Sequence, residues 1–288
     1  MDMEMKKAGS GKELAGLYLK RYDKAKTIRQ KWEGLFQECY EYALPMRETF
    51  YSQAIGERRD DKIFDETAVV GVQEFASRLQ SGLVPNFARW ADFTSGSEVP
   101  KGERDSINNQ LDEVTDYVFE VLQNSNFAQE VHESFMDLAV GTGVLYVSEG
   151  DAIHPVKFSA LPLPHVVLDV GPDDMIDHVY RERTIRNSEI KVVYPKAKMS
   201  PELTNSIMSN PEGKATILEV VCRNYSKPNE DAFYSIVIET NTKSVLIHDD
   251  LKGTGSNPFL CFRWSKCAGE VYGRGPLLNA LSAIKTTN

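Results

Sequence analysis

The spacing of apolar residues changes at the Gly141-Thr142-Gly143 stretch, and this change constrains the fold more than any other feature of the chain. Before it, apolar residues recur every three or four positions, which is the period of helices that bury one face. After it, they fall in short runs between Pro and Gly residues, a pattern typical of strands and turns. Helices followed by strands, without regular alternation, predict an α+β fold and argue against a Rossmann-type parallel sheet.

The helical half predicts four helices, at 13–44, 65–82, 108–124 and 126–140. Pro45 ends the first helix because a proline cannot continue one. Asp65 is a suitable N-terminal cap for the second, and Gly141 suits the C-terminal cap of the fourth. The RWADFT segment at 89–94 alternates between apolar and polar residues and therefore predicts a strand.

The second half predicts mainly strands. The segments VLYVSEGD, HPVKFSALPL, PHVVLDVGPDD and MIDHVYRERTI read as short strands, and ATILEVVCRNY, FYSIVIETN, KSVLIHDD and NPFLCFRWS as a four-stranded antiparallel meander. Short helices are predicted at 189–194 and from Pro201, with Ser200 as a cap. A last helix is predicted from Pro276, directly after the YGRG turn.

The composition is that of an acidic globular protein. The chain has 288 residues, 41% of them apolar, and a formal net charge of -9. Such a charge argues against a protein that grips nucleic acid over its whole surface, because neutralising phosphates takes clustered Lys and Arg. Four scattered cysteines without CxxC spacing predict free thiols. Residues 1–11 are expected to be disordered, and they lack the apolar core of a signal peptide.

A search for catalytic chemistry finds no strong motif. His132-Glu133 lacks the second histidine of a zinc protease, and the acidic GPDDMID segment lacks the spacing of a calcium loop. No metal, cofactor or catalytic residue is therefore predicted. The Tyr272–Pro276 turn does open a helix, so an enzyme of unrecognised fold with an anion site there is an alternative interpretation. A monomeric scaffold or adaptor is another.

Four segments, taken together and in order, resemble the portal proteins of short-tailed phages, the head-to-tail connector family. They are FDETAVVGVQEFASRLQSGLVPNFARWADF, NFAQEVHESFMDLAVGTGVLYVSEGD, KFSALPLPHVVLDVGPDDMIDHVYRERTI and GEVYGRGPLLNALSAIKTTN. The resemblance covers roughly residues 15 to 288. The four segments follow the same order as in the N-terminal portion of the family's proteins.

The resemblance implies a structural protein rather than an enzyme. Family members form a ring, typically of twelve subunits, around a channel for double-stranded DNA at one capsid vertex of the virion. This implies roles in genome packaging and ejection, and assembly in the host cytoplasm. The implied partners are the terminase packaging motor, a tail adaptor protein, and capsid and scaffolding or internal core proteins, with no membrane. The implied chain continues beyond Asn288 into a channel loop and a crown.

Carried onto this chain, the resemblance implies a helical wing with a β-rich middle, stem helices and a small antiparallel β clip. The wing would cover 12–184, the descending stem 185–213, the clip 214–268 and the start of the returning stem helix 269–288. DNA-channel candidates in the implied stem are Lys191, Lys196, Lys198 and Lys285, with ordinary solvated charges as the alternative. Candidates for clip contacts with partner proteins are Arg223, Lys243 and Arg263.

Overall fold

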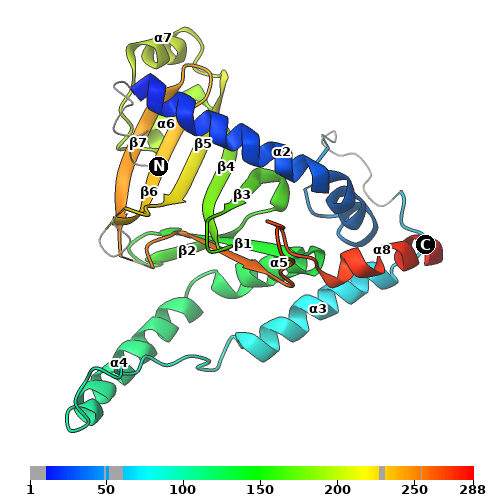
Figure 1. Ribbon diagram of the computed structural model, residues 1–288, viewed down its shortest axis with the longest axis vertical. Helices are drawn as coiled ribbons and strands as arrows, with labels where there is room; N and C mark the ends of the chain where they lie inside the picture. Colours follow the sequence, from blue (N-terminus) through cyan, green and yellow to red (C-terminus); the bar gives the residue numbers. More distant parts are fainter. Residues whose placement is uncertain (1–10, 49, 52–60, 227–230, 254) are drawn as a thin grey trace.

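The computed structural model describes residues 11–48, 50, 51, 61–226, 231–253 and 255–288. Its long helices are α2 (Gly11–Ala43), α3 (Thr67–Leu83), α4 (Arg104–Gln123) and α5 (Phe127–Val140), as the apolar spacing predicts (Figure 1). The segment expected to be disordered lies outside the described residues, apart from Gly11, which begins α2. The Asp65 carboxylate accepts a hydrogen bond from the Thr67 amide at 2.7 Å, at the start of α3.

Two antiparallel sheets form the β part of the fold, so the α+β prediction is confirmed. The larger sheet has the strand order β3-β4-β5-β6-β7 and the smaller one β2-β1-β8. The strands are β1 (Thr142–Glu149), β2 (Val156–Ala160), β3 (Val166–Val170), β4 (Ile176–Arg186), β5 (Lys214–Arg223), β6 (Asp231–Glu239), β7 (Ser244–Lys252) and β8 (Phe259–Arg263).

The predicted four-stranded meander is wrong in its last strand. Strands β5, β6 and β7 follow one another in the large sheet, but β8 leaves it and pairs with β1, with Cys261 opposite Val144. The aromatic residues of β8 account for the change: Phe259 packs on Tyr146 of β1, and Phe262 packs on Phe135 of α5. These partners lie on the small sheet and its covering helix, so β8 buries its rings only there.

Alternate residues of the large sheet serve different layers, as the period of two in a strand requires. Leu218 and Val220 of β5 pack against the N-terminal half of α2, which crosses one face of the sheet (Figure 1). Ile217 packs on the opposite face with Ile190 and Leu203. The large sheet is therefore covered on both faces.

The segment 187–213 between β4 and β5, the excursion, leaves the large sheet at Asn187 and returns to it at Gly213. It contains the turn η2 (Asn187–Glu189), α6 (Ile190–Val193) and α7 (Pro201–Ser209). The Asn187 amide donates to the Gly213 carbonyl at 2.8 Å, which closes the excursion. The Ser200 hydroxyl accepts from the Leu203 amide at 3.2 Å, so the predicted cap of α7 is confirmed. The strands before and after the expected stem, β4 and β5, are neighbours in one sheet. The division of the chain into wing, stem and clip stays a prediction.

The strand predicted at 89–94 is wrong. This segment is an extended strap that runs beside α4 without pairing to a strand. Trp90 packs on Phe119 and Phe127, with ring centroids 5.3 Å and 6.2 Å away. The apolar-polar alternation therefore reflects packing against helices, where Arg89 on the polar side pairs with carboxylates of α4. Among the described residues, no helix is both long and apolar enough to cross a lipid bilayer.

Candidate functional site

The two glycine-rich stretches singled out in the sequence pack against each other at the centre of the molecule. A Cβ atom on Gly273 would lie 2.2 Å from the Gly141 carbonyl oxygen, and one on Gly275 would lie 2.1 Å from the Ala139 carbonyl oxygen. Gly141 also has a φ angle of 150°, in the range that favours glycine. Glycine is required at these positions because two backbone segments touch, one at the end of α5 and one before α8 (Pro276–Thr287).

The amides of the second turn are engaged by this contact. The Gly273 amide donates to the Thr142 hydroxyl at 2.9 Å, the Arg274 amide to the Ser265 carbonyl at 3.0 Å, and the Gly275 amide to the Val140 carbonyl at 2.9 Å. An anion at a helix N-terminus needs donors that point at it without another acceptor. These three donors already have acceptors in the chain, so the turn joins two parts of the fold and does not favour an anion site.

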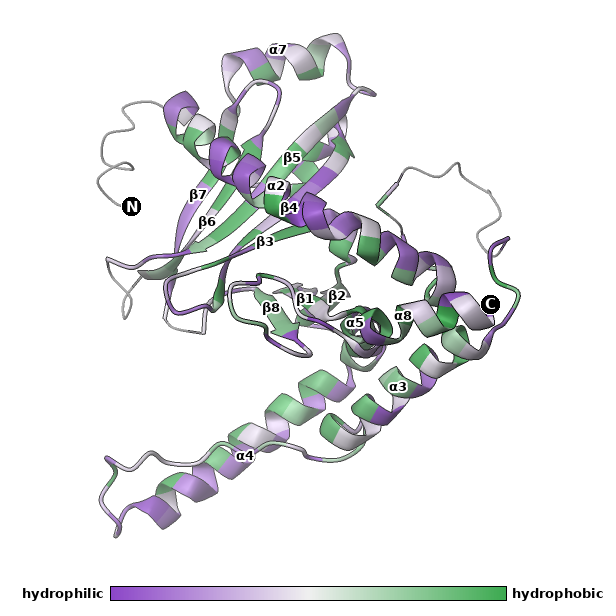
Figure 2. Ribbon diagram, turned by 45° about the vertical axis from the view of Figure 1, so that its right-hand side comes forward, coloured by the Kyte–Doolittle hydropathy of each residue, from purple (hydrophilic) through white to green (hydrophobic). Residues whose placement is uncertain are grey.

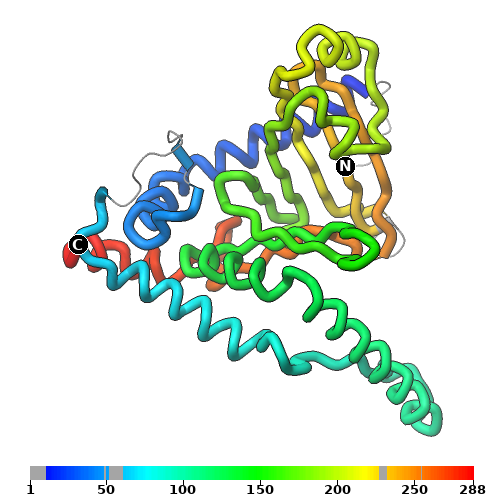
Figure 3. The backbone as a smooth tube through the Cα atoms, turned by 180° about the vertical axis from the view of Figure 1, so that it is seen from behind, coloured from blue at the N-terminus to red at the C-terminus, as the bar shows by residue number. Residues whose placement is uncertain are grey.

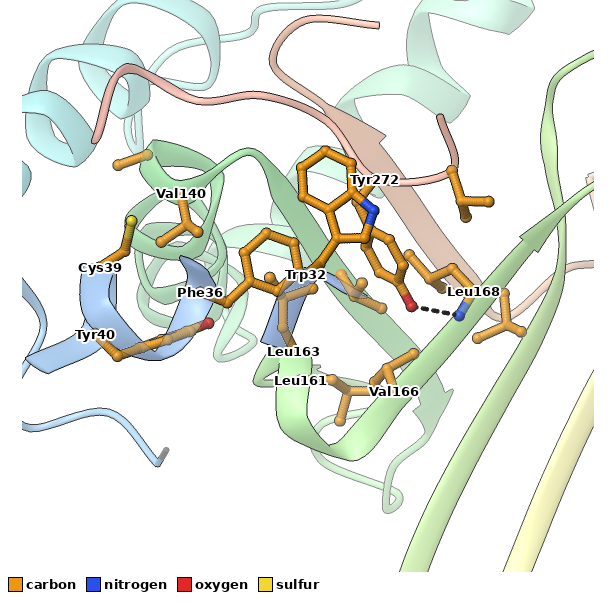
Figure 4. Packing of buried hydrophobic residues seen from close by; sticks show 14 of the residues in the cluster. Trp32, Phe36, Cys39, Tyr40, Val140, Leu161, Leu163, Val166, Leu168 and Tyr272 are labelled. Carbon is orange, nitrogen blue, oxygen red and sulfur yellow. Dashed lines mark hydrogen bonds between the residues drawn. The ribbon is translucent and has the colours of Figure 1, made fainter. Parts of the chain in front are cut away.

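Tyr272 anchors this glycine joint (Gly141–Gly143 with Gly273–Gly275) in the main hydrophobic core. Its ring lies 5.6 Å from Phe36 and 6.3 Å from Trp32, centroid to centroid (Figure 4). Its hydroxyl accepts a hydrogen bond from the Leu168 amide at 3.2 Å. Burial raises the pKa of Tyr272 above its usual value, so the side chain is a neutral structural contact at physiological pH.

Arg274, which lies in the Tyr272–Pro276 turn of the enzyme alternative, is held in an ion pair. Its guanidinium donates to both carboxylate oxygens of Glu270, at 2.8 Å and 2.7 Å, and lies 4.9 Å from the centre of the Trp32 ring. The hydrogen bond from Arg274 lowers the pKa of Glu270 and keeps it ionised. The two charges compensate each other, and the Arg274 side chain covers the core from outside.

Arg263, a predicted clip contact, supports the segment before α8, and its role as a contact for partner proteins stays a prediction. Its guanidinium donates to the carbonyls of Glu270 at 3.3 Å, Val271 at 3.2 Å and Asp174 at 2.8 Å. It lies on β8 in the small sheet rather than on the predicted meander, because β8 pairs with β1. Three donors directed at this chain's own carbonyls give Arg263 a structural role within the subunit.

Sequence reasoning missed a buried ionic cluster where the end of α2 meets α5. Arg47 donates to Glu133 at 2.7 Å and to both carboxylate oxygens of Asp137, and the Tyr40 hydroxyl donates to Asp137 at 2.9 Å. Burial raises the pKa of Asp137, and the Arg47 charge opposes that rise. The signal in the sequence is an acidic residue on the apolar face of α5, one turn after Glu133. Nothing in the sequence shows which cation completes the cluster.

Comparison with known proteins gives a family match over nearly the whole chain. The model of a family described as "Bacteriophage head to tail connecting protein" matches residues 15–288. The chain belongs to this family. It is also 23% identical over 283 residues to a protein named "Probable portal protein" from Bordetella phage BPP-1. The match covers 93% of this chain and 50% of that protein, so the chain spans about half the length of the relative.

In this chain, the predicted channel lysines fall into two separate groups. Lys191, Lys196 and Lys198 are exposed on the excursion that contains α6, and the Lys198 amide anchors that segment to the Leu246 carbonyl at 2.8 Å. Lys285 lies on α8 at the other end of the molecule and pairs with Glu38 at 3.0 Å (Figure 1). One subunit therefore does not bring all four lysines together.

The other two predicted clip residues of the connector protein lie at opposite ends of the large sheet. Arg223 ends β5, where its guanidinium lies 5.7 Å from the centre of the Tyr225 ring. Lys243 is exposed in the turn between β6 and β7, with a φ angle of 53°. In the antiparallel pairing of β5 with β6, Arg223 lies opposite Phe233, near the start of β6. Ile217 lies opposite Glu239 at the end of β6, which is near Lys243. The two cations therefore form no common patch in one subunit.

The described residues were expected to hold no metal ligands and to keep their cysteines as free thiols. No three His, Cys, Asp or Glu side chains there are placed to hold a metal ion. The four cysteines are free thiols, as their spacing predicts, and burial raises the pKa of Cys39 and of Cys222 to about 12. The thiols of Cys39 and Cys222 therefore stay protonated and unreactive at physiological pH.

Proposed function

We propose that this chain is part of a phage portal subunit, and that identical copies form a ring around a channel for double-stranded DNA. The observation that carries the proposal is the family match over residues 15–288, joined to the similarity with a probable portal protein along 93% of the chain. A ring of twelve copies at one capsid vertex, assembled in the host cytoplasm, is the form that we expect.

The work of such a ring is geometrical rather than chemical. DNA must enter during packaging and leave during ejection, so the channel wall must not hold phosphates tightly. Tight phosphate binding needs many cations, and the chain carries 33 Lys and Arg against 42 Asp and Glu. The acidic balance supports a conduit, with a few lysines such as Lys191, Lys196 and Lys198 supplying weak contacts that depend on salt.

The ring would also present surfaces to other proteins of the phage. We propose that it docks a terminase packaging motor during filling and a tail adaptor protein afterwards, and that capsid and scaffolding or internal core proteins surround it. Two cations at the sheet ends, the half-buried Arg223 and the exposed Lys243, are candidates for these contacts. The glycine joint fixes the start of α8, which packs on the body through Leu277 and Leu281.

Native mass spectrometry of the complete subunit from its virions tests this proposal, together with electron microscopy of the same sample. We expect one closed complex of about twelve identical subunits with a central hole in end-on views. The mass of a single subunit ejected from the complex gives the copy number directly. A subunit that stays monomeric at micromolar concentration, or an open assembly without a hole, would contradict the proposal.

A further inference from the structure

Helix α4 and the strap before it form an arm that projects from the body of the molecule (Figures 1 and 3). No side chain of α4 belongs to any of the four buried hydrophobic clusters in the described residues. Hydrophilic residues gather towards the end of α4 that lies farthest from α5 (Figure 2). The arm is thus a helix without the core contacts that normally hold a helix in a folded domain.

The strap covers one side of α4 only. Arg89 pairs with Asp92, with Asp112 at 2.6 Å and with Asp116 at 3.0 Å. The Phe93 amide donates to the Thr115 hydroxyl at 3.2 Å, and Phe119 is buried under Trp90. These contacts fix the arm against itself and leave the opposite side of the helix open.

The open side of α4 combines apolar and acidic residues. Val114 is 50% exposed and Tyr117 is 65% exposed, and Val121 continues the same stripe one turn later. Glu113 and Glu120 flank this stripe, and neither has an ion-pair partner among the described residues. The helix sequence holds five carboxylates and one guanidinium, so this face suits a partner with positive charge and some apolar surface.

The outer side of α2 has the complementary properties. Lys20, Lys24 and Lys31 are exposed along it and have no ion-pair partner in the part of the chain that the structure describes. On the same side of α2, Ile28 is 38% exposed and Leu35, one turn after Lys31, is 42% exposed. The stretch KRYDKAKTIRQK at 20–31 holds six basic residues and one acidic residue.

The two faces also match in spacing. Lys24 and Lys31 are seven residues apart, as are Glu113 and Glu120, so each pair spans about 10.5 Å along its helix. Ile28 and Leu35 repeat the same interval beside the lysines. Two helices whose apolar and charged positions share a seven-residue period can pack side by side with opposite charges aligned.

We propose that the open face of α4 packs on the outer face of α2 of a second copy of this chain. Glu113 and Glu120 then pair with the second copy's Lys24 and Lys31, while Tyr117 packs on its Ile28. Within one subunit, α2 and α4 lie on opposite sides of the body (Figure 1). The contact is therefore head-to-tail, and its repetition gives a ring where the rotation between copies closes, as the proposed function requires. This inference rests on the proposed function, for which it names the contact between subunits.

Charge reversal in the complete subunit tests the contact. The variants E113K/E120K and K24E/K31E should each weaken association about tenfold at every contact, since two attractive pairs become repulsive. The quadruple variant restores opposite charges at every contact and should recover the ring. The reversals D249K/D250K and K157E/K214E, at exposed positions elsewhere, serve as matched controls. Native mass spectrometry across a dilution series gives the ring fraction of each variant.

Cross-linking separates a contact between copies from one within a chain. Subunits carrying Y117C are mixed with subunits carrying I28C and oxidised; we expect covalent dimers that contain one of each. Each cysteine variant oxidised by itself is the control, and so is the unmodified chain with its four natural cysteines. Disulfides confined to a doubly substituted single chain, with no dimer in the mixture, would overturn the proposal.

The outcomes distinguish a failure of the proposed function from a failure of this contact alone. If the unmodified subunit forms no ring, the proposed function fails and this contact fails with it. If the ring forms but its stability is the same in the charge-reversal variants and in the controls, only this contact is wrong. That second outcome would make another protein the partner of the α4 arm, whereas rescue by the quadruple variant establishes a second copy.

Discussion

The Gly275 amide donates a hydrogen bond to the Val140 carbonyl at 2.9 Å, and this contact joins the end of α5 to the start of α8. The bond depends on an approach of two backbones that leaves no room for side chains, since a Cβ atom on Gly275 would lie 2.1 Å from the Ala139 carbonyl oxygen. Two segments that are distant in the sequence are thereby held in one geometry at the centre of the core.

Gly275→Ala should destabilise the protein by about 3 kcal/mol or more, because the added methyl group collides with backbone that cannot move aside alone. The measurement is the midpoint of urea denaturation. Gly255→Ala is the matched control, since nothing lies within 4 Å of a Cβ atom at that position. Equal midpoints for the two variants would refute the joint as a tight contact.

Tyr272→Phe tests the buried hydrogen bond without removing the ring. We expect a loss of about 1–3 kcal/mol in the free energy of unfolding, because the Leu168 amide is left buried without an acceptor. Tyr117→Phe, which removes a hydroxyl from a ring that is 65% exposed, should change stability by less than about 0.5 kcal/mol. A Tyr272→Phe variant as stable as this control would show that water or a backbone shift satisfies the amide.

Arg47→Met should cost about 3–5 kcal/mol at neutral pH, because it leaves the buried Asp137 carboxylate without its cation. Burial already raises the pKa of Asp137 in the folded state above the unfolded value. A raised carboxyl pKa favours the folded state at low pH and opposes it as the pH rises above the unfolded pKa.

The penalty of Arg47→Met should therefore shrink as the pH falls and Asp137 takes up a proton. Urea denaturation of the variant and the unmodified protein at pH 7 and at pH 5 gives the two differences. Arg78→Met, which removes one partner of an exposed pair with Glu74, should cost little at either pH. A penalty for Arg47→Met that is the same at both pH values would contradict the assignment to Asp137.

Arg89→Ala should loosen the arm without affecting the body, because this guanidinium joins the strap to Asp112 and Asp116 of α4. Hydrogen exchange followed by mass spectrometry should show faster exchange in peptides from α4 and unchanged exchange in those from β4 and β5. Arg78→Ala provides an exposed arginine for comparison. Unchanged protection in α4 would mean that Trp90 and Phe119 alone hold the arm.

In the assembled ring, replacing Lys191, Lys196 and Lys198 by Gln should weaken the salt dependence of DNA binding. Each lost phosphate contact lowers the slope of log K against log salt by about 0.9. Lys214→Gln, at an exposed position on β5, is the control. A slope that does not differ from the control would leave these three lysines as solvated charges.

The parts of the fold that depend on local sequence could be predicted, whereas the parts that depend on distant partners could not. Pro45 and Gly141 bound helices as expected, and Ser200 caps α7. The strand predicted at 89–94 was wrong because alternation of apolar and polar residues does not reveal whether a strand or a helix lies beside the segment. The departure of β8 was missed because Phe259 finds Tyr146, more than a hundred residues earlier in the chain.

In the candidate site, too, features that depend on local sequence could be predicted and contacts between distant residues could not. The sequence marked both glycine turns, but only the fold shows that Gly141 and Gly273 touch. Arg263 was predicted as a candidate contact for partner proteins, and the structure directs its guanidinium at three carbonyls of its own chain. The choice between an exposed contact and an internal one depends on pairing across the sheet, which the sequence alone does not contain.

The excursion between β4 and β5 has a consequence for variation among related chains. It leaves the sheet at Asn187 and rejoins it at Gly213, and one hydrogen bond between these residues closes its base. Strand pairing continues from Arg186 opposite Lys214, and residues between them such as Ile190 and Leu203 pack on β5, at Ile217. A longer loop, an added helix or a peptide tag near Ser209 would therefore leave the register of the sheet unchanged. This end of the subunit is a place where new recognition elements can be grafted, by evolution or by design, while the core stays as it is.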